Sequence, residues 1–317
     1  IPNNTFKVTV YYSAPPTCPG PSGLVASNIT ANSVDLSWTS GGAANWQLQY
    51  WPQSTPNNKT IVNVTTNPYT LTGLNASTSY SIRLRDSCGL NDVSFWTPQI
   101  LVKTNCATIS APWVENFDSP DWVVSSFGNN GSVDTCFSRN WNNNYTWETG
   151  PPSFVSTLTG PAADHTSGSG KFIYSDVNGF STLSDTAIIT TPAIDLSPLN
   201  IPELTFWYHM FGDDIGSLKV QISNNNGTSF TDIVTKNGEQ QNSNNDPWKE
   251  QIVDLSAYAN NTVILRFMAI LPSFGFRADV AIDDIDIHEQ PTCPKPVNLQ
   301  VLARSFDRVT LGWTSGG

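Results

Sequence analysis

The run Asp283, Asp284 and Asp286 is the densest group of carboxylates in the chain that could do acid–base chemistry. Two carboxyl groups that face one substrate are what a glycoside hydrolase needs. Strand alternation, however, places Asp284 and Asp286 on one face and Asp283 on the other. The spacing therefore favours a structural role for this run over catalysis.

The three histidines, His165, His209 and His288, lie outside the common catalytic motifs. None belongs to an HExxH zinc sequence, and the chain has no GxSxG nucleophile turn. We expect His165 to form a structural hydrogen bond. His209 shares a strand face with Trp207 and is predicted to be a hydrogen-bonded imidazole in the core. This segment is therefore predicted to be no enzyme, which leaves room for a catalytic domain elsewhere in a parent protein.

Three aromatic residues, Trp122, Trp141 and Tyr145, lie among Asn and Gly residues. Exposed indole and phenol rings can stack on sugar rings while side-chain amides bond the hydroxyl groups. These residues are therefore candidates for binding a polysaccharide. The alternative is core packing, which we expect for the neighbouring Trp147.

The chain has five cysteines with no zinc-type spacing. We interpret them as disulfides formed in an oxidising compartment, although buried free thiols are the alternative. The economical pairs are Cys18 with Cys88 and Cys106 with Cys136, and Cys293 is expected to pair outside this sequence.

The composition fits a secreted β protein. Only 13% of residues are charged, the net charge is −11, and no cluster of Lys and Arg appears along the sequence. The acidic balance argues against nucleic acid as a partner, and no apolar run is long enough to insert into a membrane. We therefore expect an extracellular or cell-surface location.

Short alternating segments predict the strands that must position these residues. Val34, Leu36 and Trp38 share one face of such a segment. Further strands are expected at 171–176, 204–211, 218–223, 248–255, 262–269 and 278–287, and no segment has helical periodicity. The fold is predicted to be all-β.

Residues 15–105 resemble a fibronectin type III domain, an immunoglobulin-like sandwich. The resemblance is carried by Trp38, by WQLQY at 46–50 and by LTGLNASTSYSIRLR at 71–85. It implies that Cys18 and Cys88 lie at one pole of the sandwich.

Residues 106–290 resemble a MAM domain, which is a jelly roll of extracellular proteins. The matching pieces are ENFD at 115–118, GPAADHTSGSGKFIY at 160–174, LTFWYHMFG at 204–212 and DVAIDDIDI at 279–287. The family's usual four cysteines are not all present in this sequence.

The MAM resemblance also implies a structural Ca²⁺ site. Carboxylate oxygens are the ligands that Ca²⁺ prefers. Asp118, Asp164 and Asp283 are the expected ligands, with Glu115 and Asp279 as lesser candidates. The alternative is that these carboxylates cap turns or face solvent.

The chain also repeats itself. TCPGPSGLVASNITANSVDLSWTSGG at 17–42 aligns without a gap with TCPKPVNLQVLARSFDRVTLGWTSGG at 292–317. Residues 1–14 are expected to end a preceding β domain, and residues 291–317 to begin a second fibronectin-like domain.

Alternating modules of this kind resemble segments of large secreted or surface adhesin-like proteins of Bacteroidota-type bacteria. The predicted function is non-catalytic spacing and weak, repeated binding to extracellular polysaccharide or a surface protein, alongside neighbouring modules of the same chain. The alternatives are an accessory region of a secreted protease or glycoside hydrolase, and a carbohydrate-binding module.

Overall fold

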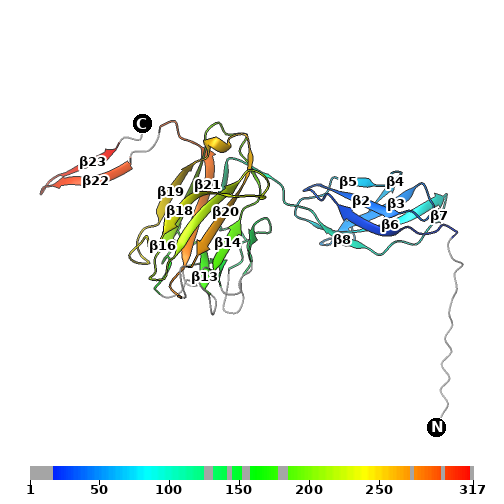
Figure 1. Ribbon diagram of the computed structural model, residues 1–317, viewed down its shortest axis with the longest axis horizontal. Helices are drawn as coiled ribbons and strands as arrows, with labels where there is room; N and C mark the ends of the chain where they lie inside the picture. Colours follow the sequence, from blue (N-terminus) through cyan, green and yellow to red (C-terminus); the bar gives the residue numbers. More distant parts are fainter. Residues whose placement is uncertain are drawn as a thin grey trace, which may run out of the picture. The chain divides into compact units, whose positions relative to one another are not determined.

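The computed structural model describes residues 17–124, 131–140, 145–151, 158–177, 185–271, 275–293 and 297–314. The chain divides into two compact units, Ile1–Ala107 and Thr108–Gly317 (Figure 1). Each unit has its own hydrophobic core. Strands make up the regular structure of the described residues, with a short 3-10 turn at Ser256–Tyr258. The fold is all-β, as predicted. No helix in the described part of the chain is long and apolar enough to cross a membrane.

The first unit is a sandwich of two sheets. One sheet has the order β1-β2-β5, and the other has the order β4-β3-β6-β7 with β8 also paired to β6. The strands are β1 (Ser22–Ser27), β2 (Ser33–Thr39), β3 (Trp46–Pro52), β4 (Thr60–Val64), β5 (Tyr69–Thr72), β6 (Ser79–Gly89), β7 (Asp92–Val93) and β8 (Ile100–Lys103). Alternate residues of both sheets meet in the core, where Leu36, Leu48 and Leu84 are fully buried.

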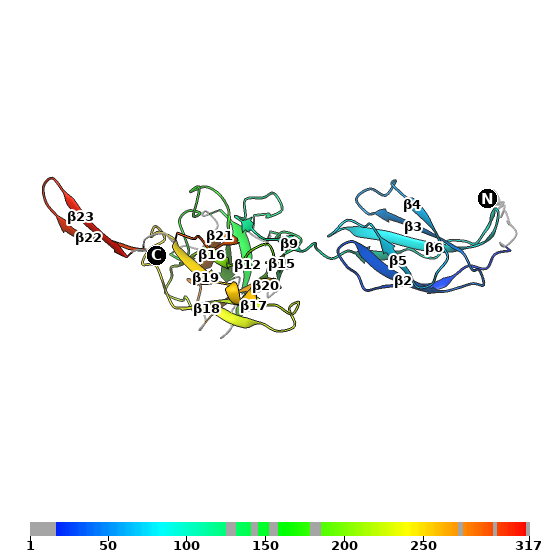
Figure 2. The same ribbon diagram turned by 90° about the horizontal axis from the view of Figure 1, so that it is seen from above.

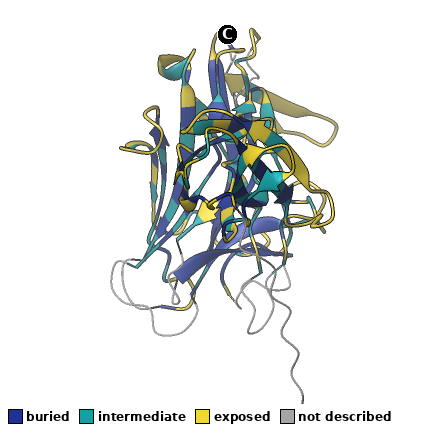
Figure 3. Ribbon diagram, turned by 90° about the vertical axis from the view of Figure 1, so that its right-hand side faces the viewer, coloured by how far each residue is buried: buried dark blue, intermediate teal, exposed yellow. Residues whose placement is uncertain are grey.

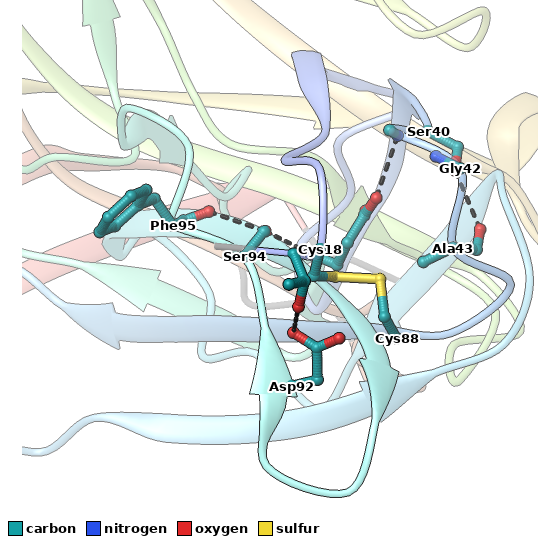
Figure 4. Close-up of a disulfide and its surroundings, with 11 residues drawn as sticks. Cys18, Ser40, Gly42, Ala43, Cys88, Asp92, Ser94 and Phe95 are labelled. Atoms are coloured by element: carbon teal, nitrogen blue, oxygen red, sulfur yellow. Dashed lines mark hydrogen bonds between the residues drawn. A yellow bond between two sulfur atoms is a disulfide. The ribbon is translucent and has the colours of Figure 1, made fainter. Parts of the chain in front are cut away.

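A disulfide joins the start of this unit to the end of β6. Cys18 is bonded to Cys88 with their Cα atoms 5.7 Å apart (Figure 4). Cys106 and Cys136 are also disulfide-bonded, and Cys293 is free and exposed. Both predicted pairs are thus confirmed, since these are the only cysteines of the chain.

The second unit contains two larger sheets (Figure 2). The first has the order β12-β13-β21-β16-β19, with β10 paired to β21. Its strands are β10 (Trp113–Glu115), β12 (Tyr145–Gly150), β13 (Phe172–Val177), β16 (Pro202–Met210), β19 (Lys249–Asp254) and β21 (Val280–Glu289). All its pairings are antiparallel.

The other sheet has the order β11-β14-β20-β15-β9, with β17 paired to β20 and β18 paired to β17. Its strands are β9 (Ile109–Ser110), β11 (Ser138–Arg139), β14 (Thr186–Thr190), β15 (Ile194–Asp195), β17 (Ser217–Ser223), β18 (Thr231–Asn237) and β20 (Thr262–Ile270). The two sheets share one large core, in which Phe206 of β16 meets Phe267 of β20 edge to face at 5.5 Å. Buried residues follow the strands, and many exposed ones lie in turns (Figure 3).

After the second unit's sheets the chain forms a hairpin of β22 (Val297–Arg304) and β23 (Val309–Thr314). Trp313 of β23 is 59% exposed, whereas its repeat counterpart Trp38 is buried. The reason is that no second sheet among the described residues covers the hairpin.

Candidate functional site

Two of the predicted cation ligands meet beside Gly170. Asp118 Oδ1 accepts the N–H of Lys171 at 2.8 Å, and Asp164 accepts the N–H groups of Ser167 and Gly170 at 2.9 and 2.8 Å. A Cβ placed on Gly170 would lie 2.9 Å from an oxygen of each carboxylate. The position therefore requires glycine, and the two carboxylates approach each other across it.

These hydrogen bonds set the charge of Asp164. Burial favours the neutral acid, but the N–H groups of Ser167 and Gly170 outweigh it and hold the pKa of Asp164 below its ordinary value. Asp164 is therefore an ionised, oxygen-only group, which is the ligand chemistry of a hard cation.

Asp283 of β21 lies next to this pair. Its Oδ2 accepts the N–H of His165 at 2.9 Å, and its Oδ1 accepts the N–H of Asp284 at 2.9 Å. Burial raises the pKa of Asp283 to about 8, and the charges of Asp284 and Asp164 add to this effect. Burial thus favours the protonated form of Asp283 up to a higher pH than for an ordinary aspartate.

The lesser candidates have other partners. Glu115 at the end of β10 accepts the N–H of Phe117 at 2.8 Å, and burial raises its pKa. The backbone N–H of Asp279 donates to Thr159 Oγ1 at 2.9 Å, and its side chain is buried. Within the described ranges no three His, Cys, Asp or Glu side chains converge as metal ligands would. A cation shared by Asp118 and Asp164 would take its remaining oxygens from backbone or water.

A β-bulge corrects the predicted placement of Asp283 and Asp284. The pairing of β16 with β21 shifts register between Thr205, opposite Asp286, and Trp207, opposite Asp283. Asp284 takes a positive φ of 46°. The bulge turns both Asp283 and Asp284 toward the loop that contains His165, so the predicted strict alternation is wrong here.

His165 is held in place by a hydrogen bond and by an aromatic stack. Its Nδ1 lies 2.6 Å from Asp284 Oδ2, and its ring stacks on Trp207 with centroids 3.8 Å apart. Thr166 Oγ1 donates to the same carboxylate oxygen. The predicted structural hydrogen bond of His165 is confirmed, and Asp284 is occupied by it.

A second, small core lies under this loop on the outer face of the sheet. It contains Phe172, Tyr174 and Ala281, with Trp248 packed against them. The indole N–H of Trp248 donates to the Ala163 carbonyl at 2.9 Å and ties the loop down.

His209 lies beside Trp248 at this small core, with ring centroids 5.7 Å apart. It is fully buried, and burial lowers its pKa to about 4. Backbone hydrogen bonding at Asp246 and Ser243 partly opposes this lowering of the pKa. The predicted core position of His209 is confirmed. The third histidine, His288, lies 3.3 Å from Glu203 and 3.2 Å from Asp286.

Two of the predicted sugar-stacking residues belong to the core. Trp122 is 1% exposed and packs edge to face on Phe117 and Phe137 at 4.8 and 4.9 Å. Tyr145 is equally buried and bonds Ser175 Oγ at 2.9 Å. Neither ring is open to a ligand, because neighbouring aromatic and strand residues enclose both. The third, Trp141, lies outside the described residues. Trp147 is buried, as expected.

Comparison with known families decides what these two units are. The family model described as MAM domain, meprin/A5/mu, matches residues 126–294, which is more than half of the chain. The chain belongs to the MAM domain family. The fibronectin type III domain model matches residues 19–100. Both domains are non-catalytic modules and are typical of extracellular or surface proteins.

The curated relatives of this MAM-family chain are much longer than it is. Neuropilin-1a of Danio rerio is 30% identical over 170 residues, which cover 52% of this chain and 17% of that protein. MAM domain-containing protein 2 of Mus musculus is 26% identical over 159 residues, covering 50% and 22%. The chain thus spans about a fifth of the length of these relatives.

Solved structures are similar to the two modules of this chain at low identity. The FN5 domain of Drosophila Lar is 22% identical with a TM-score of 0.26, covering 28% of this chain and 99% of that domain. The K1 cleaved adhesin domain of Lys-gingipain from Porphyromonas gingivalis W83 is 17% identical with a TM-score of 0.38, covering 56% and 98%.

Proposed function

We propose that this chain is a non-catalytic segment of an extracellular adhesive protein, in which two β modules space and present binding surfaces. The observation that carries the proposal is the succession of a fibronectin type III module and a MAM module in one chain. The finer parts of the proposal are a bacterial adhesin as the parent protein and a polysaccharide or surface protein as the ligand.

The titratable groups of the second unit are engaged in structural contacts, which supports a non-catalytic role. His165 and Asp284 bond each other, His209 is buried, and Asp164 is bonded to backbone N–H groups. A general acid or base must reach a substrate proton directly or through one water. Among the described residues of the second unit, His165 and Asp284 instead hold a loop to the sheet.

The test is adhesion of the 317-residue chain displayed in many copies. Beads coated with the chain are flowed over surfaces of alginate, cellulose, chitin or mucin, and a monomeric sample is measured in parallel. We expect retention on at least one surface, and at least tenfold stronger binding by the multivalent beads than by the monomer, because repeated weak contacts combine.

Two results would overturn the proposal. Loss of all retention in the multivalent format would exclude an adhesive role for this segment. Release of reducing sugar or peptide from the same surfaces by the chain alone would make it an enzyme. The alternative, an accessory region of a secreted hydrolase, predicts a catalytic motif elsewhere in the same reading frame, which sequencing of the gene reveals.

A further inference from the structure

All the basic residues of the first unit's described part face one side of one sheet. Residues 17–105 contain four, Lys59, Arg83, Arg85 and Lys103. Their strand neighbours Tyr80, Ile82, Leu84 and Val102 point into the core, so alternation turns the arginines and Lys103 outward. Lys59 directly precedes β4, in line with outward-facing Ile61, which is 49% exposed. We call this outer surface of β4, β3, β6 and β8 the basic face.

The cations of the basic face are interleaved with indole rings. Lys59 Nζ lies 4.9 Å from the ring centroid of Trp51. Arg83 Cζ lies between two rings, 5.5 Å from Trp51 and 4.7 Å from Trp96, and Arg85 Cζ lies 4.4 Å from Trp96. Aromatic faces attract cations and restrict their rotamers. This alternating row of Lys59, Arg83 and Arg85 with Trp51 and Trp96, which we call the ladder, therefore holds three long side chains in place.

Glutamines opposite the arginines fix them further. Gln49 is paired across the strands with Arg83, and Gln47 with Arg85. Each amide oxygen accepts the Nε–H of its arginine, at 2.8 and 2.9 Å. Only Nε is used in these bonds, so the terminal N–H groups that bind carboxylate or sulfate in pairs remain available.

The charge of the basic face has no ion-pair partner among the described residues. In the described part of the chain none of the ion pairs includes Lys59, Arg83 or Arg85. The one acidic residue of the four strands, Asp86, is fully buried and bonds Gly41 N. Burial and the charge of Arg83 lower the pKa of Arg85, which reflects two guanidinium groups held side by side. Elsewhere the chain is acidic: residues 106–290 contain 22 Asp and Glu but only seven Lys and Arg.

A polar hollow adjoins the ladder at Arg85. Its volume is about 710 Å³, within the range of small-ligand sites, and Arg85 forms part of its wall. Four amide side chains also line it: Asn45, Gln47, Asn63 and Asn91. Amides donate and accept hydrogen bonds at once, as sugar hydroxyl groups do.

We propose that the basic face binds an anionic polysaccharide, with Arg85, Arg83 and Lys59 contacting its carboxylate or sulfate groups and the amides of the hollow contacting its hydroxyls. The inference rests on the proposed adhesive function and names its ligand class and site. The amide-lined hollow favours a sugar over an acidic protein, whose side chains would leave these amides unpaired.

The test uses the whole chain and three soluble probes: alginate, a polyuronate; heparin, a sulfated polysaccharide; and poly-glutamate, an acidic polypeptide. The variant R83Q/R85Q removes two charges from the basic face. The matched control R304Q/R308Q removes two charges from the exposed β22–β23 hairpin. A second variant, N63D/N91D, adds repulsive charge beside the hollow without touching the ladder.

We expect wild type to bind alginate or heparin, with affinity that falls as salt rises. R83Q/R85Q and N63D/N91D each lose at least tenfold in affinity, while R304Q/R308Q stays within twofold. Alginate and heparin together distinguish carboxylate from sulfate as the preferred anion. Near-ultraviolet circular dichroism checks that the variants keep their tertiary structure.

Three results would overturn the inference. The first is no binding of wild type to either polysaccharide at 50 mM salt (about a 14 Å screening length). The second is binding by R83Q/R85Q that equals binding by the control R304Q/R308Q, and the third is tighter binding to poly-glutamate than to both polysaccharides. If R83Q/R85Q beads still adhere to surfaces as wild type does, the inference fails and the proposed function stands. If wild-type beads adhere to nothing, the proposed function itself fails.

Discussion

His165 Nδ1 lies 2.6 Å from Asp284 Oδ2, although 119 residues separate them in the sequence. The contact exists because a bulge in β21 turns Asp284 toward the loop, where the imidazole also stacks on Trp207. The loop is thereby joined to β21, a central strand of its sheet, through one side-chain pair. The pair is structural, and its contribution is measurable.

We expect His165→Ala and Asp284→Ala each to lower the free energy of unfolding by about 1–2 kcal/mol, because each leaves a partly buried partner unpaired. Asp284→Asn should cost less, since Asn tolerates the positive φ and keeps an acceptor. Urea unfolding of both single variants and the double variant measures the coupling. Strictly additive losses would contradict a direct interaction.

The stability of the second unit should fall as the pH rises toward 8. Burial raises the pKa of Asp283 from 3.8 to about 8, so the folded state keeps a proton that the unfolded chain has lost. This stabilisation is complete below pH 3.8 and disappears as the pH rises through 8, with a slope of at most about 1.4 kcal/mol per pH unit. Unfolding in EDTA between pH 6.5 and 8.5 measures it. Asp283→Asn should flatten the slope, and an unchanged slope would assign it to other groups.

His209 should act in the opposite direction at lower pH. Burial lowers its pKa from 6.5 to about 4, so the unfolded chain binds the proton more readily. The stabilisation from the neutral ring is present above pH 6.5 and is lost as the pH falls through 4. His209→Phe should reduce the loss of stability between pH 6 and 4, as followed by thermal melting. A melting temperature with the same pH dependence in both proteins would rule this out.

Removing the Cys18–Cys88 disulfide should destabilise the first unit alone. The bond closes a long loop of the unfolded chain, so Cys18→Ala with Cys88→Ala should cost about 2–4 kcal/mol. Calorimetry should show one transition shifted downward and the other unmoved. Cys293→Ala is the control, because Cys293 is free and exposed. Movement of both transitions would show that the two units unfold together.

A structural Ca²⁺ held by Asp118, Asp164 and Asp283 remains a prediction, and the first two carboxylates meet beside Gly170. Millimolar Ca²⁺ should then raise the melting temperature of the second unit relative to EDTA, since a ligand of the folded state stabilises it. Asp118→Asn should abolish the increase. Asp121→Asn, an exposed neighbour, should leave it intact. Equal melting temperatures in Ca²⁺ and in EDTA would contradict the prediction of a structural cation.

The sequence predicts best what local alternation determines. Val34, Leu36 and Trp38 recur every second residue, and all three are buried in β2. Such a pattern needs no knowledge of distant partners. The same alternation predicts the strands of both units and their separate cores.

The bulge in β21 is also visible in the sequence, as a change in the spacing of its isoleucines. Ile282, Ile285 and Ile287 all belong to the core, and the three-residue step between the first two requires an extra residue on the outer face. Reading apolar spacing before charge would have placed Asp283 and Asp284 together. By contrast, the burial of Trp122 depends on Phe117 and Phe137, which approach through irregular segments without a period to read. The basic face depends on strand register, which short-range patterns do not contain.

Mechanical tension would follow an unusual route through the first unit. Cys18 precedes β1 and Cys88 lies near the end of β6, so a pull applied before Cys18 passes through the sulfur bridge and skips the chain between them. Only the segment from Cys88 through β8 would then stretch. Reduction would release the shielded loop, whose 70-residue separation corresponds to about 25 nm of added contour length. The reach of this module under load is therefore set by the redox state of its surroundings.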